Sequence, residues 1–139
     1  MAYALQNDPS EECRVLSIRL FLGVEALLLA GFGVAYFLRP HEMGTLSGML
    51  LMEPAAVTDV RAYYGALQVG VAVFLGLGIV RVELIRPALL LLVVLFSSLA
   101  VGRLLGLWLD GGAQQTFNLW ALLFEMVSAA VAGWLLRRA

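Results

Sequence analysis

The chain has 139 residues, and its composition excludes a water-soluble fold. Hydrophobic residues make up 62% of it and charged residues only 14%, whereas a soluble domain carries about 25% charged residues. A water-soluble fold of this size could not bury so much apolar surface, but a bilayer is itself an apolar solvent. The net charge of -1 gives no electrostatic reason to expect a nucleic acid partner. We expect one integral membrane domain, residues 1–139, with the lipid bilayer as its surroundings.

Four long apolar runs predict four transmembrane helices. They cover residues 15–38, 60–80, 87–109 and 117–136, and each is close to the ~20 residues that an α-helix needs to cross the hydrocarbon core. Because the backbone in lipid must satisfy its own hydrogen bonds, runs of this length fold as helices. Short connections after the second and third runs make their neighbours antiparallel. The predicted fold is an all-α integral membrane protein, an antiparallel bundle of four transmembrane helices.

Prolines and polar residues indicate where these helices begin and end. Asp8-Pro9 predicts that the first helix begins near residue 9, and Pro40 predicts that it ends near residue 39. Asp59 and Thr116 are the expected N-caps of the second and fourth helices. Two further signals are Arg86-Pro87, expected to separate the second and third helices, and Gly111-Gly112, expected to end the third.

The first connection, residues 40–58, is longer than the others. It contains apolar residues in a pattern suited to a short helix lying on the membrane surface: Leu46, Met49, Leu50 and Met52. The distribution of arginine predicts on which side this segment lies, because cytoplasmic ends carry an excess of positive charge. One end of the bundle holds Arg14, Arg81, Arg86, Arg137 and Arg138. Both termini are therefore expected in the cytoplasm, with residues 40–58 on the outer side of a bacterial inner membrane.

Ionisable residues lie inside the predicted helices. Arg61 opens the second helix, whereas Glu25, Arg103 and Glu125 lie within the first, third and fourth. An ionisable side chain at the bilayer centre costs from ~2.5 to over 10 kcal/mol, so it faces the bundle interior and finds a partner. At about 1.5 Å of rise per residue, Arg103 and Glu125 reach a similar depth on consecutive helices. We expect these two side chains to form an ion pair.

Other polar residues lie near this pair in the predicted bundle. Gln68 is level with it, and the hydroxyl of Tyr64 can reach Arg61 or Glu125. Glu25 is deeper, has no arginine at its own depth, and is expected to be protonated. The spacing Gly102-x-x-x-Gly106 predicts close helix packing beside Arg103. The predicted polar cluster comprises six residues: Glu25, Arg61, Tyr64, Gln68, Arg103 and Glu125.

Several functions remain open for this cluster. Its ion pairs can simply fix the packing register, or its groups can line a cavity for a lipid, a quinone or another small molecule. A proton or ion path would need several copies of the chain, because four short helices make a poor pore. One cysteine, Cys13, and one histidine, His41, cannot build a usual metal site. We expect no metal and no cofactor, and a non-enzymatic module that binds an apolar ligand, a membrane protein partner or a second copy.

Short motifs resemble a known family. The segment Asp59-Val60-Arg61-Ala62-Tyr63-Tyr64-Gly65, followed by Gly70, Gly102-Arg103-Leu104-Leu105-Gly106, Asp110 and Glu125, resembles a family of small bacterial four-helix membrane proteins, domain of unknown function 4345. The resemblance covers about residues 15–136. This family is distantly similar to DoxX-type proteins, some of which are linked to quinone-dependent oxidoreductases. The resemblance implies that Arg61, Gly65, Arg103 and Glu125 form one site.

Two alternative functions follow. The resemblance to DoxX-type proteins implies an accessory subunit of a quinone-linked redox system. The two buried glutamates also resemble those of sterol-isomerase and sigma-2-type bundles, in which carboxylates meet a cationic or sterol-like ligand. The scarcity of aromatic residues near Glu25 and Glu125 argues against this second alternative.

Overall fold

The computed structural model describes residues 9–111 and 115–139, which are helical over almost their whole length and include no strand. The elements in chain order are α1 (Pro9–Leu38), α2 (Pro40–Leu46), α3 (Pro54–Val60), the π-helix η1 (Arg61–Ala66), α4 (Leu67–Val80), the 3-10 turn η2 (Val82–Leu84), α5 (Ile85–Asp110) and α6 (Thr116–Leu136). The all-α prediction is confirmed.

Four helical spans are long and apolar enough to cross a membrane: Glu11–Leu38, Pro54–Val80, Val82–Asp110 and Thr116–Leu136. Only 17% to 28% of the residues in their apolar windows are buried. Large apolar side chains such as Leu27, Val80 and Trp108 are exposed instead. Exposed apolar patches of this extent are not tolerated on a monomeric soluble protein, whereas lipid solvates them. The chain is therefore a multi-pass membrane protein.

The second span begins earlier than the sequence predicted. α3, η1 and α4 follow one another without a break, so the helix begins at Pro54 and not near residue 60. Pro54 occupies the first helical position after the extended residue Glu53, where the missing N–H of proline costs no hydrogen bond. Asp59 lies inside α3, so its prediction as an N-cap is wrong.

The predicted outer segment does contain a short helix, α2, but it ends at Leu46 and residues 47–53 are non-helical. The apolar residues Met49, Leu50 and Met52 therefore do not belong to a surface helix as expected.

The later boundaries differ by a few residues. The turn between α4 and α5 is formed by Arg81 and η2, and Pro87 lies in the first turn of α5, where proline is tolerated. Arg86-Pro87 therefore does not separate these helices as expected.

The boundary between α5 and α6 also differs from the prediction. The N-cap of α6 is Gln115, and Thr116 is the first residue of the helix and not its N-cap. α5 ends at Asp110 before Gly111, which has φ of 54° as a terminal glycine often does. The predicted roles of Asp8 and Gly112 lie outside the described residues.

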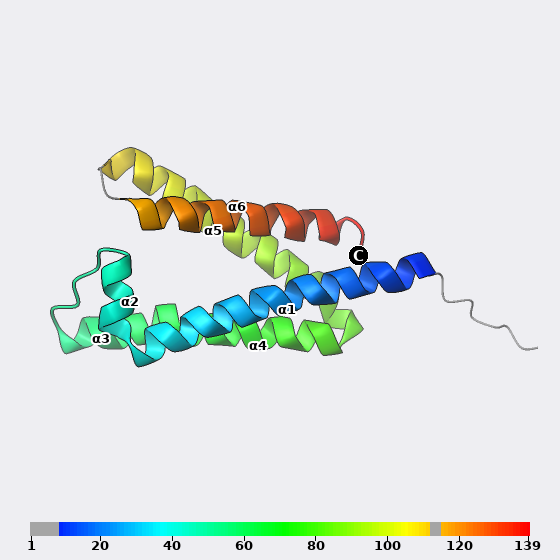
Figure 1. The fold of residues 1–139 in the computed structure, drawn as a ribbon, viewed down its shortest axis with the longest axis horizontal. Coiled ribbons are helices and arrows are strands. Elements are labelled where there is room, and N and C mark those ends of the chain that lie inside the picture. Colours follow the sequence, from blue (N-terminus) through cyan, green and yellow to red (C-terminus); the bar gives the residue numbers. More distant parts are fainter. Residues whose placement is uncertain (1–8, 112–114) are drawn as a thin grey trace, which may run out of the picture.

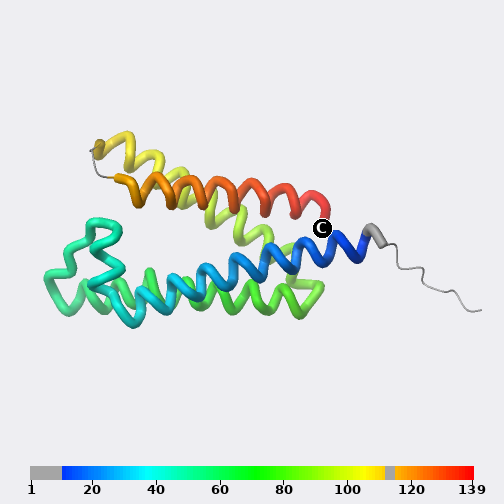
Figure 2. The backbone as a smooth tube through the Cα atoms, in the orientation of Figure 1, coloured from blue at the N-terminus to red at the C-terminus, as the bar shows by residue number. Residues whose placement is uncertain are grey.

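The four long helices form two pairs. α1 lies along α4 and η1, and α5 lies along α6. Figure 1 shows α5 leaving α4 at the right of the picture and running diagonally away from it, so that the two pairs diverge toward the left. We call the right-hand end, which holds the α4–α5 connection, the inner end, and the end with α2 the outer end. The tube in Figure 2 shows the same divergence of the helix axes.

The apolar core lies toward the inner end. Its buried residues come from all four long helices: Ile18, Leu22, Leu75, Ile85, Ala88, Leu89, Leu92, Phe96, Ala132 and Leu135. The contributions of α1 and α6 stop at Leu22 and Ala132, one turn before Glu25 and Ser128 in the outward direction. The fully buried part of the core therefore lies on the inner side of Glu25 and Ser128 on these two helices, although partly buried residues such as Ala26 and Leu29 continue it outward along α1.

Two glycines let α1 and η1 touch. A Cβ on Gly33 would lie 2.8 Å from the carbonyl oxygen of Gly65 and 3.0 Å from the backbone nitrogen of Val69. A Cβ on Gly65 would lie 3.0 Å from Cβ of Phe37. These distances leave no room for a side chain, so small residues set the spacing of the pair, as is typical of helix contacts in membranes.

We predict that Gly33→Ala destabilises the protein, because its methyl group must displace the backbone of η1. The matched control is Gly31→Ala on the same helix, whose Cβ would meet nothing within 4 Å and which gains up to about 1 kcal/mol of helix propensity. Titration with a denaturing detergent, followed by circular dichroism, measures both. Equal stability of the two variants would contradict the close contact.

Candidate functional site

Arg103 on α5 and Glu125 on α6 form the predicted ion pair. The Nε of Arg103 donates to both carboxylate oxygens of Glu125 at 3.1 Å, and Nη2 donates to Oε1 at 2.7 Å. The side chain of Glu125 is 5% exposed and that of Arg103 is 25% exposed. These three charge-assisted hydrogen bonds fix the orientation of both groups. The pair therefore holds α5 and α6 in a defined register.

A line of side-chain hydrogen bonds continues from this pair toward the outer end. Nη1 of Arg103 donates to Oδ1 of Asn118 at 2.6 Å, and Nδ2 of Asn118 donates to Gln115 at 2.9 Å. Gln115 in turn donates to the carbonyl oxygen of Gly111 at 3.2 Å. Arg103 thus uses Nε, Nη1 and Nη2 within the protein, which reduces the cost of placing a guanidinium group in a membrane helix.

Glu25 on α1 is the second buried carboxyl group. The hydroxyl of Ser128 on α6 donates to its Oε1 at 2.7 Å. Glu25 is only 3% exposed, and its Oε2 is fully buried without a hydrogen-bond partner among the described residues. Ser128 lies almost one turn along α6 from Glu125, on the same buried face. This face of α6 therefore meets Arg103 from its own pair and Glu25 from the opposite pair.

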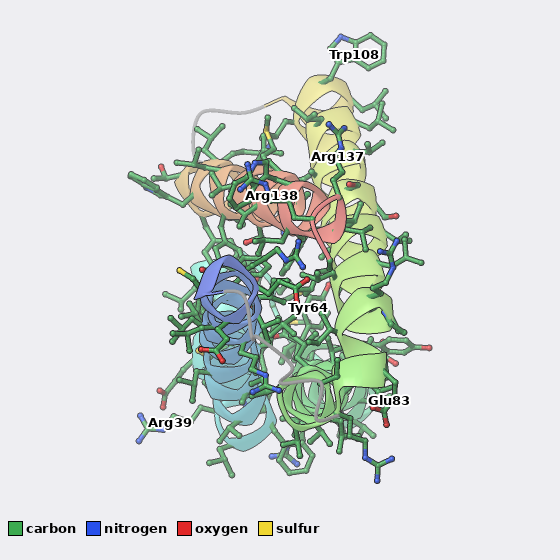
Figure 3. All side chains as sticks on the ribbon, turned by 90° about the vertical axis from the view of Figure 1, so that its right-hand side faces the viewer. Arg39, Tyr64, Glu83, Trp108, Arg137 and Arg138 are labelled. Atoms are coloured by element: carbon green, nitrogen blue, oxygen red, sulfur yellow. The ribbon has the colours of Figure 1, made fainter. Side chains whose placement is uncertain are left out.

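The remaining predicted residues lie on the other helix pair. Arg61 and Tyr64 are exposed and Gln68 is partly buried, and within the described part of the chain none of them is hydrogen-bonded to Arg103 or Glu125. Figure 3 shows Tyr64 near the middle of the molecule, in a view along the helices. Its ring lies 5.4 Å from that of Tyr36 on α1. The divergence of the two pairs toward the outer end separates the predicted cluster into two groups.

Some residues of this region were not predicted from the sequence. Tyr36 is only 4% exposed, and it lies on the face of α1 that also buries Ile18, Leu22, Glu25 and Gly33. The spacing of these residues is that of one helix face, so the periodicity contained the signal. The π-helix at η1 has no comparable signal, although π-helical segments are frequent at functional sites. It coincides with most of the segment that carries the family resemblance.

The glycines beside Arg103 do not pack as predicted. A Cβ on Gly102 would meet nothing within 4 Å, and a Cβ on Gly106 would meet only Asp110 of the same helix. The close approach of α5 to another helix is made by Ala88, whose Cβ would lie 3.1 Å from a Cβ on Gly78. Within the part of the chain that the structure describes, Gly102 and Gly106 therefore make no close contact with another helix.

The family comparison covers the whole of this region. Residues 17–136 match the profile of DUF4345, a domain of unknown function. The chain belongs to the DUF4345 family. No curated protein and no solved structure matches it. All six residues of the predicted polar cluster lie inside the DUF4345 match. Because the domain has no assigned function, a function for this chain has to be inferred from its geometry.

The DUF4345 chain has a shallow, open apolar groove on its surface, along η1 and α4, with Leu91 of α5 at its edge. The groove has a volume of about 600 Å³. Its lining residues are almost all apolar: Ala62, Tyr63, Ala66, Leu67, Gly70, Val71, Phe74 and Leu91. A shallower hollow of about 440 Å³ adjoins it through Phe74 and Leu91. The residues that the structure describes include no group of three metal-ligating side chains.

Proposed function

We propose that this protein is a non-enzymatic membrane protein that binds an apolar ligand, of the lipid or quinone class, in the groove along η1 and α4. The observation that carries this proposal is the groove itself. It exists because α5 contacts α4 near the inner end and then leaves it. Ala62, Ala66 and Gly70 recur every four residues along its wall, so small side chains keep it open.

The chemistry of the groove favours a ligand with a long apolar part and a polar end. An apolar molecule gains no hydrophobic free energy by moving from lipid into the groove, so selectivity depends on shape and on polar contacts. Tyr63 is the lining residue with a hydroxyl group, and it lies in η1 toward the outer end of the groove. A quinone ring or lipid headgroup at this end would meet the hydroxyl of Tyr63 while its chain follows Phe74 and Leu91.

Mass spectrometry of protein extracted in mild detergent tests this proposal. The wild type is expected to retain one ligand class enriched over bulk lipid, and Gly70→Leu is expected to lose about tenfold of it, which corresponds to ~1.4 kcal/mol. Gly76→Leu is the matched control, because a Cβ at either glycine would meet nothing within 4 Å and Gly76 does not line the groove.

The outcome also separates the alternatives. An enriched quinone would support a role in a quinone-linked redox system, and an enriched phospholipid would support a lipid-binding role. Equal ligand content in Gly70→Leu and Gly76→Leu would contradict binding in the groove. If the wild type carries no enriched ligand, and instead forms a dimer that Gly70→Leu alone disrupts, the groove is an interface with a second copy.

We further propose that the chain lies in a bacterial inner membrane with both termini in the cytoplasm. The arginine residues near the inner end support this orientation, because positive charge accumulates on the cytoplasmic side. They include Arg81 and Arg86 at the α4–α5 connection and Arg137 and Arg138 after α6, the last of which stacks on Trp134 at 3.9 Å. Figure 3 is viewed from this end.

Thiol labelling tests the orientation. Cys13 is the single cysteine of the chain and is exposed near the inner end. A membrane-impermeant maleimide is expected to label it only after the cells are permeabilised. In the Cys13→Ala background, His41→Cys at the exposed start of α2 is expected to react in intact cells. The reverse pattern would contradict the proposed orientation.

A further inference from the structure

The buried carboxyl group of Glu25 has one oxygen atom without a partner. Oε1 accepts a hydrogen bond from Ser128 at 2.7 Å, whereas Oε2 is fully buried and makes no hydrogen bond to any residue that the structure describes. Buried polar atoms of this kind are rare, because leaving one unsatisfied costs free energy. Glu25 lines neither of the two hollows beside α4 and α5. Neither of these hollows therefore supplies a partner for Oε2.

We propose that Glu25 is a proton-binding site, and that its proton comes from the outer side of the membrane. A proton requires no space beyond that of the carboxyl group itself. On binding, one proton moves from water to Oε2 and forms one O–H bond, and on release it returns to water. Ser128 donates to Oε1 in both states. This inference does not rest on the ligand-binding groove.

The charged groups around Glu25 leave it without a counter-ion. α4 contains no titratable residue, and on α6 the titratable group is Glu125, which already pairs with Arg103 of α5. Arg19 lies six residues earlier on α1, about 9 Å further toward the inner end and on a different face. The titratable and charged groups of the other elements packed against α1 lie toward the helix ends: Arg39, His41, Glu42, Arg61, Tyr63, Tyr64, Arg86 and Asp110. An ionised Glu25 would therefore be an uncompensated charge, which a proton removes.

The polar face of α6 supports entry from the outer side. Asn118, Glu125 and Ser128 lie along this face from the outer end to Glu25, and the first two are hydrogen-bonded to Arg103. Polar side chains inside a membrane protein can form hydrogen bonds to water, and residues of this kind mark proton paths. On the inner side, Leu22 and Ala132 begin the apolar core. This core excludes water on the inner side, so we assign the proton route to the polar face of α6.

Protonation would also affect how the two helix pairs meet. The bond from Ser128 to Glu25 is the side-chain hydrogen bond that joins α1 to α6 among the described residues. A neutral carboxyl group is compatible with this dry contact. An ionised one would draw in water, and it would do so between the pairs. The proton on Glu25 thus favours the contact between α1 and α6.

Infrared spectroscopy of the protein in lipid vesicles tests the proposal. We expect the carbonyl band of a protonated carboxyl group at neutral pH, absent in Glu25→Gln and retained in Glu83→Gln, whose carboxyl group is exposed. Ser128→Ala is expected to move the band to higher frequency, because the carbonyl loses a hydrogen bond. If Glu25→Gln does not fold, as judged by circular dichroism, the shift in Ser128→Ala decides the assignment.

Two results would overturn the proposal. The first is a wild-type spectrum without a protonated carboxyl band, or with a band that Glu25→Gln and Ser128→Ala both leave unchanged. The second concerns the direction of entry, in vesicles with the protein in one known orientation. The band is expected to respond to pH in the compartment that faces the outer end, and a response only to the opposite compartment would exclude the proposed route.

Discussion

A guanidinium group inside a membrane helix needs acceptors for its donors, and this requirement determines how α5 and α6 meet. Arg103 finds a carboxylate in Glu125 and an amide oxygen in Asn118, both on α6. Each contact involves a different turn of α6, so a slip of either helix along the other would leave a buried charge without its partner. The cost of such a charge is several kcal/mol. The ion pair therefore fixes the register of the α5–α6 pair.

The rest of the arrangement follows from that register. With Glu125 turned toward Arg103, the same face of α6 presents Ser128 to Glu25 of the opposite pair. Beyond this contact the packing of the pairs is apolar and concentrated near the inner end, around residues such as Leu89 and Phe96. Toward the outer end the pairs diverge (Figure 1), and the departure of α5 from α4 leaves the groove beside Gly70. One molecule thus combines a rigid polar contact with an open apolar surface.

The sequence predicted those features that depend on depth along a helix. Four spans, their apolar surfaces and the pairing of Arg103 with Glu125 all follow from counting residues at a fixed rise. The sequence did not predict which helices lie side by side. The partner of Glu25 could not be identified, because depth alone does not tell which helix lies beside α1. The close contact expected at Gly102 is absent among the described residues, because a small residue permits a close approach but does not require one.

The local backbone structure at the outer end was predicted less well. Pro54 and Asp59 are both favourable near a helix start, and the longer helix from Pro54 is formed because it satisfies more backbone hydrogen bonds in an apolar medium. The π-helical turn at η1 has no sequence signature, and it arises where Gly65 packs directly against Phe37. Tyr64 packs against Tyr36 with its ring tilted by 33°, and it makes no hydrogen bond to Glu125 among the described residues.

A double-mutant cycle on Arg103 and Glu125 tests the central claim most directly. The free energy of unfolding in mixed micelles is measured for the wild type, Arg103→Ala, Glu125→Ala and the double variant. Each single change is expected to cost about 3–5 kcal/mol, because it leaves a charge uncompensated. The double variant is expected to lose less than the sum, with a coupling energy of about 1–3 kcal/mol. Strict additivity would show that the two side chains do not interact, and would contradict the account of how the helices are held together.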